Sequence, residues 1–206
     1  MIELFVSAFA TLFVVIDPPG CAPIFASLTS GSSAMHRRSM AVRSVSVAGL
    51  ILLAFAIFGE AFLHSLGISL DAFRIAGGIM LFLIALEMVF EKRQEKREHR
   101  AEDAKARSAP EDISIFPMGI PMIAGPGSIA SVMLLMARGR GLPEDLVVLA
   151  ALAVILVLTL AALLLAGPLM RLVGERIEAM ITRVLGVILA ALAVQFVIDG
   201  VRGSLT

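Results

Sequence analysis

Six apolar runs, each long enough to cross a lipid bilayer, restrict the folds that are open to this chain. A membrane-spanning helix needs roughly 20 apolar residues. Hydrophobic residues make up 59% of the 206 residues, against about 45–50% in a typical soluble domain. Because every backbone N–H and C=O group must be paired inside lipid, these runs predict an all-α, multi-pass membrane protein with six transmembrane helices. The runs are about 3–29, 41–66, 72–90, 113–136, 145–172 and 179–199.

The first and fourth runs each contain a helix-breaking motif. Asp17-Pro18-Pro19-Gly20 interrupts the first run, and Gly125-Pro126-Gly127-Ser128 interrupts the fourth. Proline lacks the N–H group that a helix needs, and glycine tolerates almost any backbone angle. We therefore expect helices 1 and 4 to be discontinuous. The first should stop near Ile16 and restart near Cys21, and the second should restart with Ser128 as its N-cap.

The two breaks belong to a wider repeat between the halves of the chain. The segment 74–79 (RIAGGI) resembles the segment 183–188 (RVLGVI), 109 positions later. Each half has three spans, so the second half must enter the membrane upside down relative to the first. The sequence therefore predicts two inverted-topology three-helix repeats, 1–90 and 113–206, joined by a charged linker, 91–112.

The linker 91–112 differs from the rest of the chain in its charge. Its seven Lys or Arg and seven Asp or Glu residues interleave at helical spacing. This pattern indicates a solvated helical extension, followed by a flexible stretch near Ser108-Ala109-Pro110. A regulatory or partner-binding role for the linker stays open.

The positions of the basic residues predict the orientation. With six spans, thirteen of the 17 Lys and Arg residues fall on one side of the membrane and four on the other. The positive-inside rule places the thirteen, with the linker, in the cytoplasm. Both termini should then face outward, into the periplasm.

Paired breaks in two repeated halves indicate the central site of a secondary transporter. A restarted helix offers N–H groups and a positive dipole end to a carboxylate, and a stopped helix offers carbonyls to a cation or ammonium group. At 1.5 Å per residue, both breaks lie roughly 18–20 Å into their spans, near the middle of a hydrocarbon core of roughly 30 Å. The candidate substrate-binding residues are Asp17, Pro18, Gly20, Cys21, Gly125, Pro126, Gly127 and Ser128.

Asp17 is the central candidate, because carboxylates at membrane depth are costly and usually functional. It could hold a substrate ammonium group, bind a coupling cation or carry a transported proton. A purely local role, capping the following turn, stays open. Glu60, near the outer end of span two with His64, is the second coupling-ion candidate. Plain kinks at the prolines and glycines, a packing role for Cys21 and a simple cap at Ser128 are the structural alternatives.

The composition argues against several other functions. A formal net charge of zero gives no electrostatic case for a nucleic-acid partner. The single cysteine offers no metal-binding spacing, and we expect no cofactor, metal or catalytic residue. An intramembrane protease would need a second carboxylate facing Asp17 or a base for Ser128, and His64 lies too near the outer surface. A non-transporting component, such as a sensor or an assembly partner, remains an alternative.

Four segments of the chain resemble the MarC (UPF0056) family of inner-membrane proteins, also described as the neutral amino acid transporter (NAAT) family. The resemblance implies a bacterial or archaeal transporter of small neutral amino acids such as glycine and alanine, working by alternating access. Export of other small solutes such as drugs is an alternative, because the family is named after a multiple-antibiotic-resistance locus. The segments are 13–25 (FVVIDPPGCAPIF), 72–87 (AFRIAGGIMLFLIALE), 121–129 (PMIAGPGSI) and 183–196 (RVLGVILAALAVQF).

Two further points follow for the transporter hypothesis. No P-loop motif is present, so a proton or sodium gradient is the expected driver; a homo-oligomer stays open. The family pattern DP-x-GN-x-P usually has asparagine where this chain has Cys21. A thiol offers far weaker hydrogen bonds than an amide, so the solute of this chain could differ from the family's usual one.

Overall fold

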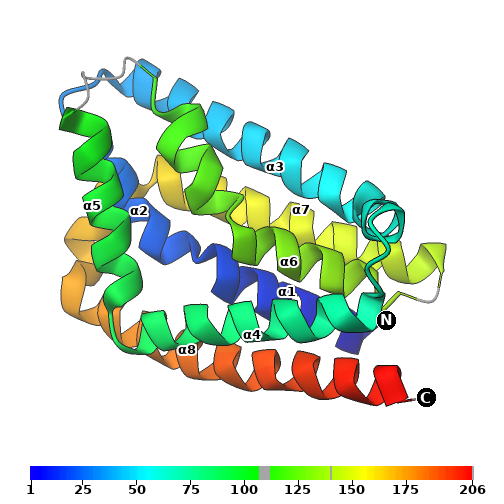
Figure 1. Ribbon diagram of the computed structural model, residues 1–206. Helices are drawn as coiled ribbons and strands as arrows, with labels where there is room; N and C mark the ends of the chain where they lie inside the picture. The colour runs from blue at the N-terminus through cyan, green and yellow to red at the C-terminus, as the bar shows by residue number, and fades with distance from the viewer. Residues whose placement is uncertain (107–111, 140, 206) are drawn as a thin grey trace.

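The computed structural model describes residues 1–106, 112–139 and 141–205, without the side chains of residues 100, 103–106 and 169–179. The described residues form helices and no strand (Figure 1), which confirms the all-α class. The helix expected in the linker is α5, whereas the stretch expected to be flexible, Ser108-Ala109-Pro110, lies outside the described residues. In chain order the elements are α1 (Ile2–Ile16), α2 (Pro18–Leu28), α3 (Ala34–Ser65), α4 (Leu70–Val89), α5 (Lys92–Ala106), η1 (Ser114–Ile123), α6 (Pro126–Met136), α7 (Leu142–Leu164) and α8 (Ala166–Leu205).

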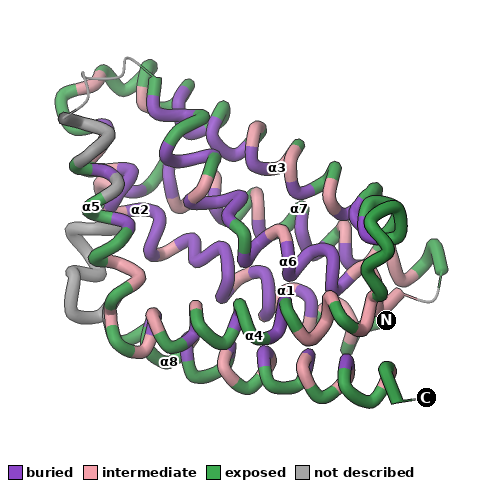
Figure 2. Tube along the Cα trace, in the orientation of Figure 1, coloured by how far each residue is buried: buried purple, intermediate pink, exposed green. Residues whose placement is uncertain are grey.

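Five helical segments of the described chain are long and apolar enough to cross a membrane, and the bent pair η1–α6 makes a sixth. Helices α1, α2 and α6 are largely buried inside the bundle, whereas α3, α4 and α8 lie at its periphery (Figure 2). The peripheral helices expose large apolar side chains, as a surface in contact with lipid requires. Examples are Leu50 and Phe58 on α3, Ile79 on α4 and Val187 on α8.

The helices α4 and α8 pack side by side and run in opposite directions (Figure 1). Glycines allow their backbones to approach closely, as is common between transmembrane helices. A Cβ atom on Gly78 would lie 2.8 Å from the carbonyl oxygen of Ala193, and one on Gly200 would lie 2.8 Å from the carbonyl oxygen of Asp71. The N-terminus and the end of α8 lie at the same end of the bundle (Figure 1).

The first break occupies a single residue. α1 ends at Ile16, and Asp17 adopts left-handed angles of φ 58° and ψ 66°. α2 then begins at once, with Pro18 and Pro19 in its first turn, where a proline removes no helical hydrogen bond. The expected restart near Cys21 was therefore wrong by about one turn, because the prolines open the new helix instead of delaying it.

The second break is wider and begins earlier than the sequence suggested. The segment η1 has the wide turns of a π-helix and is interrupted by extended residues at Phe116 and Ile120. Each of these two residues precedes a cis proline. η1 and α6 then meet at an angle of 53°, so the fourth span is bent and regular only in its second half.

Two predicted positions in the second half were also wrong. Gly125 is the N-cap of α6 and Pro126 opens its first turn, so Ser128 lies inside that turn and does not cap the helix. The fifth span was expected to reach residue 172, but α7 ends at Leu164 and α8 starts at Ala166. The turn between them was missed because the apolar run continues through it.

Candidate functional site

The two breaks meet beside a cavity of about 310 Å³ within the bundle. A Cβ atom on Gly127 would lie 3.3 Å from Cγ1 of Val15, so the end of α1 and the start of α6 are in close contact. The walls come from α1, α4, α5, η1 and the start of α6. The lining residues are Val15, Met80, Leu83, Ile84, Glu87, Arg93, Lys96, Arg97, Pro121, Met122, Gly125, Pro126, Gly127 and Ser128.

Asp17 forms an ion pair in which both partners are buried. Its Oδ1 accepts a hydrogen bond from the backbone N–H of Gly20 at 3.1 Å, and its Oδ2 accepts one from Nη1 of Arg97 at 2.8 Å. Asp17 is 1% exposed and Arg97 is 5% exposed. Nη2 of Arg97 also donates to the carbonyl of Ile16, at 3.4 Å. The guanidinium thus supplies the counter-charge that a carboxylate needs in a low-dielectric interior.

This ion pair corrects the interpretation of the linker as a solvated helix. Arg97 comes from α5, which packs against α2 and α4 and crosses one end of the bundle (Figure 1). Part of α5 does face solvent, since the side chains of His99 and Glu102 are 80% and 74% exposed. The helix α5 therefore has two different faces: one carries arginines that are buried against the bundle, and the other is exposed to solvent.

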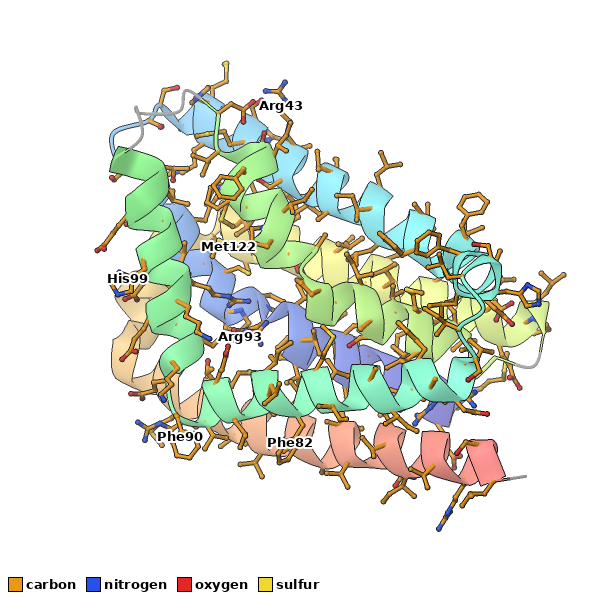
Figure 3. The ribbon with its side chains drawn as sticks, in the orientation of Figure 1. Arg43, Phe82, Phe90, Arg93, His99 and Met122 are labelled. Atoms are coloured by element: carbon orange, nitrogen blue, oxygen red, sulfur yellow. The ribbon has the colours of Figure 1, made fainter. Side chains whose placement is uncertain are left out.

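A second arginine of α5 enters the same region. Arg93 donates to the carbonyl of Val15 and, through Nη1, to the sulfur of Met88 at 3.0 Å. Figure 3 shows Arg93 reaching inward from α5, whereas His99 points away from the bundle. Burial and the neighbouring Arg97 guanidinium lower the pKa of Arg93 to about 10. Lys96, one turn along α5, pairs with Glu87 of α4.

The structure divides the predicted substrate-binding residues into two groups. Gly125, Pro126, Gly127 and Ser128 line the cavity. Asp17, Pro18, Gly20 and Cys21 are buried and are not among the residues that line it. The Cys21 thiol, which is fully buried, lies 3.5 Å from the carbonyl oxygen of Ile16. Binding of substrate by either group stays a prediction.

The structure does not bring the two coupling-ion candidates together. Glu60 lines two other cavities, of about 280 and 500 Å³. His64 lines the larger of these, at the end of α3 away from α5 (Figure 1). Among the described residues, no group of three or more His, Cys, Asp or Glu side chains is placed to hold a metal ion.

The comparison with known proteins decides the family. The MarC family, described as MarC family integral membrane protein, matches residues 2–205. The chain belongs to the MarC family. It is therefore an integral, multi-pass membrane protein, as the six apolar runs predicted.

Several MarC relatives match over almost their whole length. A UPF0056 membrane protein of Methanocaldococcus jannaschii is 40% identical, over 99% of this chain and 98% of the relative. The UPF0056 membrane protein YvbG of Bacillus subtilis is 34% identical, over 98% and 96%. The UPF0056 inner membrane protein YhgN of Escherichia coli is 34% identical, over 96% and 95%. These names give no solute and no enzymatic activity, and no solved structure matches the chain.

Sequence reasoning missed the contribution of α5 to the site of this MarC protein. Arg93 and Arg97 are four residues apart, which places them on one face of a helix. Asp17 is a carboxylate inside an apolar span and needs a positive partner. Together these two facts could have suggested the ion pair, but the linker has many basic residues and the sequence does not say which one docks.

Proposed function

We propose that this MarC protein is a secondary transporter of small neutral amino acids, such as glycine and alanine, driven by a proton or sodium gradient. It works by alternating access, in the cytoplasmic membrane, with both termini outside and α5 on the cytoplasmic side. It has no catalytic role.

One observation carries the proposal: two interrupted spans, one from each half of the chain, adjoin a cavity whose wall combines charged and apolar side chains. In lipid, irregular backbone is tolerated only where protein or a polar cavity receives the freed groups, and in transporters such breaks form the substrate site. The break at Gly125–Ser128 lines the cavity, and Val15, beside the break at Asp17, contacts Gly127. The volume of about 310 Å³ is at the small end of ligand pockets, which suits a small solute.

Two further features support the proposal. The antiparallel packing of α4 and α8, the third helices of the two proposed repeats, agrees with an inverted repeat about an axis in the membrane plane. The cavities argue against a serine protease, because Ser128 and His64, the base considered for it, line different cavities. The two repeats would rock against each other around the cavity.

Flux through the purified protein in liposomes tests the proposal. We expect labelled alanine or glycine to accumulate when a proton or sodium gradient is imposed, and not without one. Gly127→Leu should abolish this flux, because even a Cβ atom at Gly127 would lie 2.5 Å from Cδ1 of Ile84 at the cavity wall. The matched control is Gly167→Leu, since a Cβ atom at Gly167 meets no atom within 4 Å.

Two outcomes would contradict the proposal. One is an absence of gradient-driven flux by the wild-type protein for every amino acid in a broad panel. The other is equal flux by Gly127→Leu and Gly167→Leu. This second outcome would refute the assignment of the site to this cavity, but not transport itself. Both variants are first compared with wild type by thermal unfolding, so that loss of fold is not mistaken for loss of transport.

A further inference from the structure

The cavity wall carries an excess of positive charge. Four of its lining residues are of charged types: Arg93, Lys96 and Arg97 are basic, and Glu87 is acidic. Glu87 already pairs with Lys96, and Arg97 is paired with Asp17 behind the wall. Arg93 donates its hydrogen bonds to a neutral carbonyl and a thioether. Asp17 and Glu87 act on it through space, but these two carboxylates face three basic side chains, so a net positive charge remains at the wall.

The two arginines also repel each other. Burial and the guanidinium of Arg97 together lower the pKa of Arg93 to about 10. Like charges held together in a partly buried wall are unfavourable. Asp17 and Glu87 offset part of this repulsion, and an anion bound in the cavity would offset more of it. A guanidinium has five N–H donors and an ammonium has three. Arg93 and Lys96 therefore keep donors available beyond the contacts that they already make.

The start of α6 adds backbone hydrogen-bond donors to the cavity wall. α6 begins at Gly125 without a side-chain cap, and its first turn, Pro126–Ser128, lines the cavity. Free N–H groups and the positive end of the helix dipole favour an anion there. The cavity thus has cationic side chains on α5 and backbone donors on α6, with the apolar Ile84 and Met122 among its remaining lining residues.

We propose that this cavity binds the carboxylate group of a small solute, and that Arg93 and Lys96 of α5 are the side chains that hold it. The inference rests on the proposed function in one respect: it takes the bound solute to be the molecule that is transported. It goes further in assigning the recognition to the carboxylate alone. The one carboxylate among the lining residues, Glu87, is neutralised by Lys96, and the net charge of the lining is positive, so the cavity does not attract a solute ammonium group. A monocarboxylate without an amino group should therefore bind as well as an amino acid.

Calorimetric titration of the purified full-length protein in a neutral detergent tests this assignment. The probes are propionate, which has only the carboxylate, alanine, which has both groups, alaninamide, which has only the ammonium, and inorganic phosphate. We expect propionate and alanine to bind with similar affinity and alaninamide not to bind. Arg93→Gln and Lys96→Gln should each weaken propionate binding about tenfold, because each removes a charge-assisted hydrogen bond.

The matched control is Lys92→Gln. It removes one positive charge from the same helix, at an exposed residue that does not line the cavity, and should leave propionate binding unchanged. Arg97 is left intact, because its loss would strip Asp17 of its counter-charge. Thermal unfolding of each variant verifies that the fold is retained.

Several results would overturn the inference. They are binding of alaninamide without propionate, unchanged binding by both cavity variants, and no binding of propionate at all. Tighter binding of phosphate than of propionate would reassign the cavity to a phosphate-bearing ligand. The liposome assay separates this inference from the proposed function. Carboxylate binding without flux refutes transport alone, and amino-acid flux that is unchanged in Arg93→Gln and Lys96→Gln refutes the inference alone.

Discussion

At the residue scale, Asp17 and Arg97 depend on each other for burial. Removing one partner of a buried ion pair costs about 3–5 kcal/mol, because the remaining charge is left without compensation. We therefore expect Asp17→Asn to lower the free energy of unfolding in detergent by about this amount. The backbone adds little to this cost, because asparagine tolerates the left-handed conformation of Asp17.

A double-mutant cycle isolates the interaction. Asp17→Asn with Arg97→Gln should recover part of the lost stability, because no unpaired charge remains. Glu102→Gln serves as the control, since the His99–Glu102 pair is largely exposed and such pairs contribute little. Additive losses in the double variant would show that the two residues are not coupled, and the site geometry would have to be abandoned.

Gly20 gives a second residue-scale prediction. A Cβ atom there would lie 2.3 Å from Oδ2 of Asp17 and 2.9 Å from Nη1 of Arg97. Gly20→Ala should destabilise the fold by about 1–3 kcal/mol, because the ion pair must open to admit the methyl group. Gly127→Ala should cost less, since its closest neighbour is the mobile end of Ile84. Thermal unfolding of both variants checks the order, and the reverse order would contradict it.

At the element scale, the pairing of α4 with α8 depends on small residues at their contact. Gly78→Ala places a methyl group 2.8 Å from the Ala193 carbonyl oxygen, so the two backbones must separate. We expect a loss of about 1–3 kcal/mol in the free energy of unfolding. Ala76→Leu, on the exposed face of the same helix, is the control and should have little effect. Equal losses in the two variants would indicate a general weakening of α4 instead.

The elements also show how far a sequence of this kind can be interpreted. Runs of apolar residues gave the spans because lipid forces each span to satisfy its own backbone. The interleaved charges of 91–112 gave a helix, but they fit a solvated helix equally well. Docking of α5 depends on a contact between Arg97 and a residue 80 positions away, which no local pattern encodes. Likewise, Pro18 suits both the end of one helix and the first turn of another, so the restart of α2 was misplaced.

The candidate site could also be predicted only in part from the sequence. Proline and glycine marked Gly125–Ser128, and these residues do line the cavity. Pro117 and Pro121, within the same run, are also helix-breaking residues, and both lie in the irregular η1 segment. Arg93 and Lys96 were not anticipated, because basic residues in a linker are ordinarily explained by solvation and by the orientation rule.

At the scale of the whole molecule, the charge distribution still predicts which end faces the cytoplasm. The end that holds α5 also carries the ion pairs Arg43–Asp112 and Arg183–Glu91, so basic residues gather there. In a Cys21→Ala background, which has no other cysteine, we expect a membrane-impermeant maleimide to label Leu66→Cys in intact spheroplasts. Lys92→Cys should be labelled only after the membrane is opened. Leu66 and Lys92 are both exposed on the protein. A difference in labelling would therefore report the side of the membrane on which each residue lies.

The orientation bears on the mechanism, because α5 forms part of the cavity wall. If the labelling places Lys92→Cys in the cytoplasm, then Arg93, Lys96 and Arg97 line the cavity on its cytoplasmic side, and the cavity would recognise carboxylates from that side. The native protein, whose Cys21 is fully buried, is the control and should stay unlabelled in opened membranes. Labelling of Lys92→Cys in intact spheroplasts, with Leu66→Cys protected, would invert the molecule. The cationic wall would then face the periplasm, and the cavity would recognise carboxylates arriving from outside the cell.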